Sequence, residues 1–212
     1  MNIYHKWEQI TSNYGLHEED AETQLRLLIS LYNSPSRHYH NQEHIDMLIK
    51  ELSSHPQSLQ FSNEMWLALI YHDSVYEAKR DDNEKASASL FVQMWEEYMD
   101  SNSLQNVAKM ILYTQNHFNR PKALSLEVNC LLDADLSILG FDEQVYDLYV
   151  LNLRKEYNYL KDSEFMQGRK KFLEKIIHSG ENIYRDDWFN YKYEKQAQAN
   201  IQREIENLEL QK

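Results

Sequence analysis

Residues 3–14, IYHKWEQITSNY, carry apolar side chains at Ile3, Trp7, Ile10 and Tyr14. These positions are separated by four, three and four residues, a spacing that places all four side chains on one face of an α-helix. The same spacing recurs along most of the chain, and no long interval interrupts it. The sequence therefore predicts an all-α fold, a single-domain helical bundle.

Further helices follow from the same periodicity. We expect them near residues 18–32, 41–53, 62–73, 82–99, 103–117, 123–135, 142–159, 163–178 and 187–209. The connectors between them are short and have no linker composition, so residues 1–212 are predicted to form one domain. The segment 187–209 is expected to be a C-terminal packing helix, although a lid or a dimer contact would have the same pattern. The sequence leaves a homodimer open.

The amino-acid composition favours helices, and the net charge disfavours anionic partners. With 4 Gly and 3 Pro in 212 residues, the chain has little material for the tight turns of a β-sandwich or the glycine loops of a dinucleotide fold. Acidic residues outnumber basic ones by 34 to 22, giving a formal net charge of -12, which repels phosphate backbones and anionic lipid. We therefore expect neither a nucleic-acid partner nor a membrane partner.

The cellular compartment is predicted from cysteine content and apolar runs. Cys130 is the sole cysteine, which excludes an intramolecular disulfide and a cysteine-based zinc site and suits a reducing compartment. The longest apolar run, WLALIY at 66–71, is too short to cross a bilayer, and the first ten residues have no signal-like apolar core. These features predict a cytoplasmic protein.

Histidines and aspartates occur at positions where they could share a site. In RHYHNQEH, His40 and His44 are four residues apart, about 6 Å along one face if both are helical. His72 and Asp73 stand at the end of the apolar helix predicted over 62–73. Each feature alone is more typical of a helix cap or a hydrogen-bonded core group.

A third element adds carboxylates in an apolar setting. Asp133 and Asp135 lie within CLLDADLSILG, where an unpartnered carboxylate would be costly to desolvate. Together with the histidines and Asp73, they form a set of ligands typical of a borderline divalent metal such as Mn, Fe, Co, Ni or Zn. The sequence thus predicts a divalent metal as cofactor.

Four motifs carry a resemblance to a known family. They are YHNQEHI at 39–45, YHDSVY at 71–76, DNEKASA at 82–88 and DADLSILG at 133–140. The pattern is similar to the HD-domain superfamily, and in particular to bacterial predicted metal-dependent HD phosphohydrolases, over most of the chain. Cyclic-nucleotide phosphodiesterases have a similar HD core.

The resemblance implies a ligand set and a reaction. It implies His44, His72, Asp73 and Asp135 as metal ligands, and His40 as the proton donor to the leaving oxygen. The implied function is hydrolysis of a small-molecule phosphoester, nucleotides included, by attack of a metal-bound hydroxide. Asp73 would both bind the metal and orient the water.

Several neighbouring residues are secondary candidates. The resemblance implies Glu84 as a catalytic, water-orienting carboxylate, with Asn83 and Asp133 supporting the ligands. His117 and Arg120, three residues apart, are candidates for binding the substrate phosphate, as is Asn41. The remaining histidines are assigned structural roles, and three basic residues near the motifs are expected to be solvated surface charges: Arg37, Lys79 and Arg80.

Three other functions share residues with this pattern. HNQEH also fits H-x-x-E-H, the inverted zinc-peptidase motif with Glu43 as general base, but that function leaves His72 and Asp73 without a role. A di-iron carboxylate bundle is excluded because no Glu has a His three residues later. A non-catalytic HD module that binds a nucleotide as a sensor would have the same residues as the enzyme.

Overall fold

A computed structural model describes residues 1–117, 121–178 and 180–210. They form ten α-helices and three short 3-10 helices, and none of these residues is in a strand, so the fold is all-α as the periodicity predicts. The helices are α1 (Ile3–Tyr14), α2 (Glu18–Tyr32), α3 (Gln42–Ser54), α4 (Asn63–Tyr71), α5 (Asn83–Trp95), α6 (Ser101–Tyr113), α7 (Leu126–Asp135), α8 (Glu143–Glu156), α9 (Asp162–Ile177) and α10 (Asp187–Leu210). Within the described part of the chain, no helix is both long enough and apolar enough to cross a membrane.

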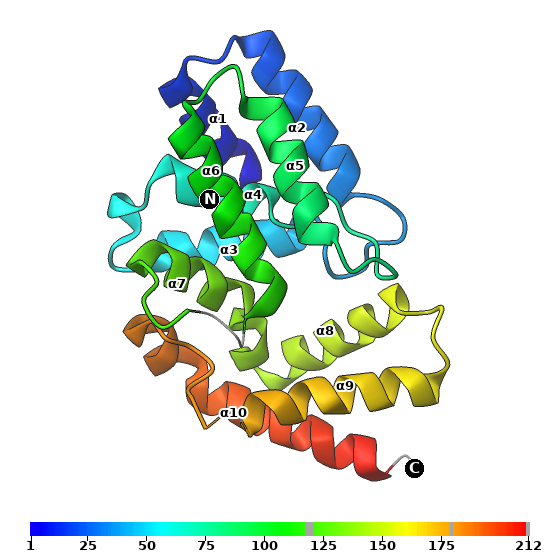
Figure 1. Cartoon of the computed structure of the whole chain (residues 1–212). Helices are drawn as coiled ribbons and strands as arrows, with labels where there is room; N and C mark the ends of the chain where they lie inside the picture. The colour runs from blue at the N-terminus through cyan, green and yellow to red at the C-terminus, as the bar shows by residue number, and fades with distance from the viewer. Residues whose placement is uncertain (118–120, 179, 211–212) are drawn as a thin grey trace. The chain divides into compact units, whose positions relative to one another are not determined.

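The contacts within the chain divide it into two compact units, Met1–His117 and Phe118–Lys212. The first unit contains α1 to α6, coloured blue to green in Figure 1, and the second contains α7 to α10. Each unit has its own set of packed helices and is described separately below. That residues 1–212 form a single domain stays a prediction.

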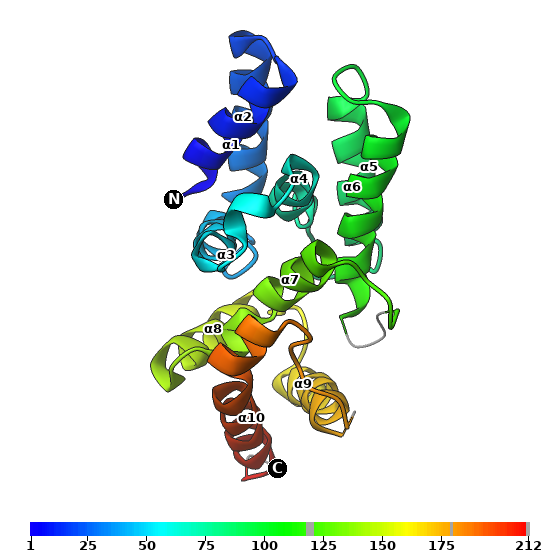
Figure 2. The same ribbon diagram turned by 90° about the vertical axis from the view of Figure 1, so that its left-hand side faces the viewer.

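Helix α4 is the centre of the first unit. Every side chain from Met65 to Tyr71 is buried, and α4 packs against α1, α3, α5 and α6. Figure 2 shows α1 and α2 on one side of α4, and α5 and α6 on the other. A helix that is apolar around its whole circumference belongs in a core, so its last turn delivers the following residues, His72 and Asp73, to a buried place.

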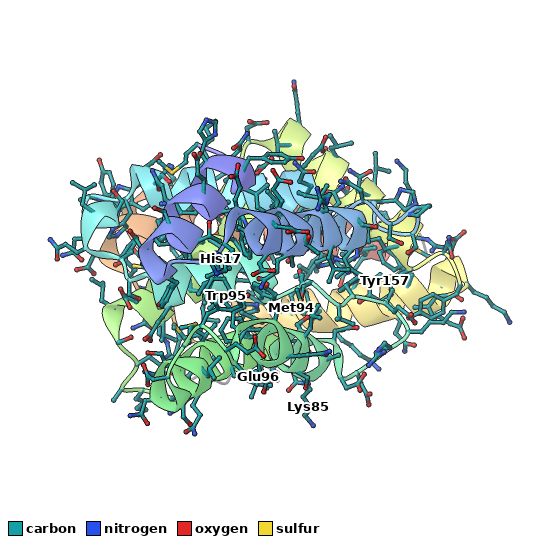
Figure 3. The ribbon with its side chains drawn as sticks, turned by 90° about the horizontal axis from the view of Figure 1, so that it is seen from above. His17, Lys85, Met94, Trp95, Glu96 and Tyr157 are labelled. Atoms are coloured by element: carbon teal, nitrogen blue, oxygen red, sulfur yellow. The ribbon has the colours of Figure 1, made fainter. Side chains whose placement is uncertain are left out.

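Aromatic packing holds α1, α4 and α5 together. The Trp95 ring is fully buried and lies edge-on to Trp7, with ring centroids 5.8 Å apart, while its indole N–H donates to the Tyr71 hydroxyl at 3.0 Å. In Figure 3, Trp95 lies inside the first unit, whereas Lys85 on the same helix reaches the outside. The amphipathic spacing of α1 and α5 thus produces the expected core.

In the second unit, α10 packs closely on the 3-10 helix Ser137–Gly140. A Cβ atom at Gly140 would approach the Cβ of Tyr193 to 2.5 Å, so only glycine fits there without displacing α10. The Asn200 side chain donates to the backbone carbonyls of Leu139 and Phe141 at 2.9 and 2.8 Å. These contacts fix α10 to the turn that ends at Gly140.

Several expected helices are shorter in the structure, and two of the differences affect the candidate site. The helix predicted over 82–99 ends at Trp95, and the one predicted over 103–117 ends at Tyr113 and is followed by a 3-10 turn, Thr114–Asn116. His117 therefore lies beyond the helix on which the sequence analysis placed it. His40 also lies outside a helix, because Asn41 is the N-cap of α3.

Candidate metal centre

Three potential ligands meet in the first unit. His44, His72 and Asp73 are 3%, 1% and 7% exposed, and one ligand atom from each lies within 4.8 Å of the other two. Oδ2 of Asp73 is 3.2 Å from Nε2 of His72 and 3.9 Å from Nε2 of His44. Two imidazoles and a carboxylate at this separation could hold a metal ion, as the sequence analysis predicts for these three residues.

The orientation of His72 is fixed by the end of α4. His72 is the C-cap of that helix, and its Nδ1 lies 2.8 Å from the Leu69 carbonyl oxygen. A carbonyl oxygen can only accept a hydrogen bond, so Nδ1 carries the proton. Nε2 is then the atom that faces the Asp73 carboxylate, and the contact is favourable only with a proton or a cation between them. A ligating histidine in proteins is typically held in this way through its other ring nitrogen.

The orientation of His44 depends on the start of α3. The side-chain oxygen of Asn41 accepts the backbone N–H groups of Glu43 and His44 at 2.9 and 3.3 Å, which caps the helix. This capping places His44 in the first turn, with its ring turned inward. In this structure the Asn41 side-chain oxygen caps α3. The contact between Asn41 and a substrate stays a prediction.

His40 lies close to His44 without sharing its helix. The centroids of the two rings are 5.9 Å apart, close to the separation expected from the spacing, although His40 precedes α3. The His40 ring stacks on Tyr76, with centroids 4.1 Å apart and planes 26° apart. This contact with the turn after Asp73 was not anticipated, because no local pattern pairs residues 40 and 76.

Arg37 corrects an expectation. Its sequence context predicts a solvated surface charge, but Arg37 is 7% exposed and donates to three backbone carbonyls, those of His40, Asp73 and Ser74. An arginine can be buried where its planar fork of N–H groups meets several acceptors. Lys79 and Arg80 are exposed, as expected, and Arg80 pairs with Asp82 at 2.8 Å.

Asn83 and Glu84 begin α5 near this site. The Asn83 side chain donates to the Glu77 carbonyl and accepts the Glu77 N–H, both at 3.0 Å, and thereby fixes the loop that follows Asp73. Burial raises the pKa of the half-buried Glu84 carboxyl; the charge of Asp73 raises it further, and His72 and His117 lower it. Glu84 thus lies within electrostatic reach of two of the candidate ligands.

The other predicted residues are placed as follows. His117, the last residue of the first unit, is half-buried and affects the pKa of Glu84. Arg120 lies outside the described residues. Glu43, the general base of the peptidase alternative, is exposed on α3.

Asp133 and Asp135 belong to the second unit. The Oδ2 atom of the fully buried Asp133 accepts the backbone N–H groups of Arg185 and Asp186 at 2.8 and 2.7 Å, so this carboxylate holds the segment before α10. The assignment of Asp133 as a support of the metal ligands stays a prediction. Asp135 is the half-buried last residue of α7, and its assignment as fourth ligand stays a prediction.

The comparisons with known proteins add no family to this description. No protein-family model matches the chain, and no curated protein sequence matches it. The resemblance to HD phosphohydrolases therefore stays a prediction based on the four motifs. What the structure establishes is an all-α chain in which two buried histidines and a buried aspartate are grouped so that they could hold a metal ion.

Proposed function

We propose that this protein is a metal-dependent phosphohydrolase of the HD type, with His44, His72 and Asp73 as ligands of one divalent metal. The observation that carries the proposal is the geometry of His72. Its Nδ1 is bound to the Leu69 carbonyl, and its Nε2 lies 3.2 Å from the Asp73 carboxylate, beside the ring of His44. Together these three residues offer two imidazole nitrogens and a carboxylate oxygen to a single divalent cation.

The donor set favours a particular class of metal. Two imidazole nitrogens and a carboxylate oxygen suit Mn, Fe, Co, Ni or Zn better than Mg or Ca, which prefer oxygen ligands alone. The resemblance adds Asp135 as a fourth ligand. A bound ion of this class would supply a Lewis acid that polarises a phosphoryl oxygen and lowers the pKa of a coordinated water.

The chain's own residues would complete the reaction. Asp73 orients the attacking water, together with the half-buried Glu84, whose carboxyl pKa is raised by burial. His40, held by its stack on Tyr76, gives a proton to the leaving oxygen. His117 and Arg120 bind the phosphate of a small-molecule phosphoester, nucleotides among them.

The metal is tested first. Metal-stripped protein is titrated with Mn, Fe, Co, Ni and Zn, and bound metal and melting temperature are measured. We expect about one metal per chain and a rise in melting temperature. His44→Ala should lose both effects, whereas His17→Ala, an exposed histidine that forms no side-chain capping bond, should lose neither. Wild-type protein that takes up none of these metals would contradict the proposal.

The chemistry is tested on a panel of phosphomonoesters and phosphodiesters, with phosphate and alcohol release measured separately. His40→Ala should keep its metal but turn over about 10²–10⁴-fold more slowly, as expected for loss of a general acid. The defect should shrink with a nitrophenolate leaving group, which needs no proton. Equal losses for good and poor leaving groups would rule out this role of His40. Metal and nucleotide binding without turnover would favour a sensor instead.

A further inference from the structure

Arg37 connects two segments that carry the candidate ligands. It lies between α2 and α3, and its Nη1 donates to the His40 carbonyl at 3.2 Å and to the Asp73 carbonyl at 2.6 Å. Its Nη2 donates to the Ser74 carbonyl at 2.8 Å. One guanidinium thus bridges the segment that leads into His44 and the turn that contains Asp73.

The guanidinium is itself held in place by two aromatic rings. Its central carbon lies 5.1 Å from the centroid of Tyr32 and 5.7 Å from that of Tyr76, within range of cation–π attraction. The Tyr32 hydroxyl donates to the Ile70 carbonyl in the last turn of α4 at 2.7 Å. Tyr76 in turn stacks on His40. Each neighbour of Arg37 therefore also contacts an element that carries a candidate ligand or acid.

The acceptors decide between two roles for this arginine. A substrate phosphate would need N–H groups directed at the ligand, but Nη1 and Nη2 already donate to backbone carbonyls, and the residue is 7% exposed. The contacts of Arg37 therefore suit support of the protein's own backbone better than binding of a substrate.

We propose that Arg37 is a positioning residue that sets the separation between the His40–His44 segment and the His72–Asp73 turn, and thereby the affinity for the metal. This inference rests on the proposed metal site. Residues that orient metal ligands without touching the metal typically change metal affinity by about 10–100-fold when removed. Lysine cannot replace it, because a single ammonium lacks the planar fork that reaches carbonyls in two segments.

The experiment compares Arg37→Met and Arg37→Lys with a matched control, Arg154→Met. Arg154 also donates to two backbone carbonyls, those of Tyr157 and Leu160, but in the second unit. Co²⁺ affinity is measured by titration of metal-stripped protein, with the visible Co²⁺ spectrum as a record of ligand geometry. Arg37→Met should weaken Co²⁺ binding about 10–100-fold and alter the spectrum. Arg154→Met should leave both unchanged, even though its melting temperature falls.

The outcomes separate this inference from the proposed function. If the wild type binds no Co²⁺, the metal site itself is wrong. If the wild type binds Co²⁺ and Arg37→Met binds it equally well, only the role of Arg37 is wrong. Should Arg37→Met fail to fold, wild-type affinity in Arg37→Lys would overturn the proposal, and weakened affinity would support it. Loss of inorganic phosphate binding at saturating Co²⁺ would also overturn it, since Arg37 would then be a phosphate ligand.

Discussion

Each unit of the chain contains a buried polar cluster, and the two clusters are built differently. In the second unit, Arg169 donates from Nε and Nη2 to the two carboxylate oxygens of Glu204 at 2.9 and 3.0 Å, and from Nη1 to the Tyr149 hydroxyl at 2.9 Å. The Tyr146 hydroxyl also donates to Glu204. In the first unit, the groups that converge are two imidazoles and a carboxylate, His44, His72 and Asp73.

The difference is the source of positive charge. In the second unit, the protein supplies a cation, Arg169, directly to the buried carboxylate, and the cluster is complete as a structural element. In the first unit, the buried arginine, Arg37, donates to backbone carbonyls. The second cluster therefore contains its own countercharge, whereas the proposed metal would bring one to the first.

The largest effect is expected from breaking the second cluster. Arg169→Met leaves the Glu204 carboxylate buried without its bidentate partner, which should lower the free energy of unfolding by about 3–5 kcal/mol. Urea denaturation measures the loss, and added metal should not restore it. The double variant Arg169→Met/Glu204→Leu should be more stable than the single variant, because both charges are gone. A double variant less stable than the single one would contradict the explanation that the buried Glu204 carboxylate without its partner causes the loss.

Asp73→Asn makes the matching change in the first cluster. With metal at about a hundredfold excess over its Kd, the wild type should gain about 2.7 kcal/mol of stability, and the variant should lose that gain. In chelator the two proteins should unfold at similar urea concentrations. Glu204→Gln serves as the control, because it should destabilise equally with and without metal. If Asp73→Asn lost the same stability with and without metal, the first cluster would be a structural element like the second.

A smaller effect is expected at the helix caps. Asn41→Ala removes the cap of α3 and should lower the free energy of unfolding by about 1 kcal/mol, while also weakening metal binding through His44. Asp142→Ala removes the cap of α8 in the second unit, where the Asp142 carboxylate accepts the Val145 N–H at 3.1 Å. It should have a similar effect on stability and none on metal binding. Identical metal affinities in the two variants would show that the α3 cap does not position His44.

The smallest effect is expected from Glu43→Gln. Glu43 is exposed on α3, so the change should alter the free energy of unfolding by less than about 0.5 kcal/mol and leave phosphoester turnover nearly intact. The zinc-peptidase alternative requires the opposite, because Glu43 would then be the general base. Turnover assays on the phosphoester panel, together with a peptidase assay, distinguish the two.

Local patterns in the sequence are sufficient for the helices and for part of the candidate centre. Apolar spacing predicts α2 over 18–32, which are also its bounds in the structure, and places His72 at the end of an apolar helix, where it is found. Both depend on residues within a few turns of one another. The grouping of His44 with His72 and Asp73 followed from residue chemistry and the resemblance, and the structure brings these three together.

What the sequence could not reveal are contacts between distant residues. Arg37 was expected on the surface because arginines usually are, but its acceptors at Asp73 and Ser74 lie 36 and 37 residues away. The backbone groups that Asp133 binds are 52 and 53 residues further along, so its local sequence does not indicate this role. Backbone N–H and C=O groups occur at nearly every position, so no sequence pattern identifies which of them will meet a given side chain.

The packing of α10 on the Ser137–Gly140 turn bears on how the second unit is made on the ribosome. Asn200 bonds the Leu139 carbonyl across 61 residues of chain. At about 5–20 residues per second, the turn is synthesised several seconds before its partner residue in α10. During that interval the buried faces of α7 and this turn lack the helix that later covers them. We therefore expect residues 126–140 to be the part of the nascent second unit that a chaperone contacts until α10 arrives.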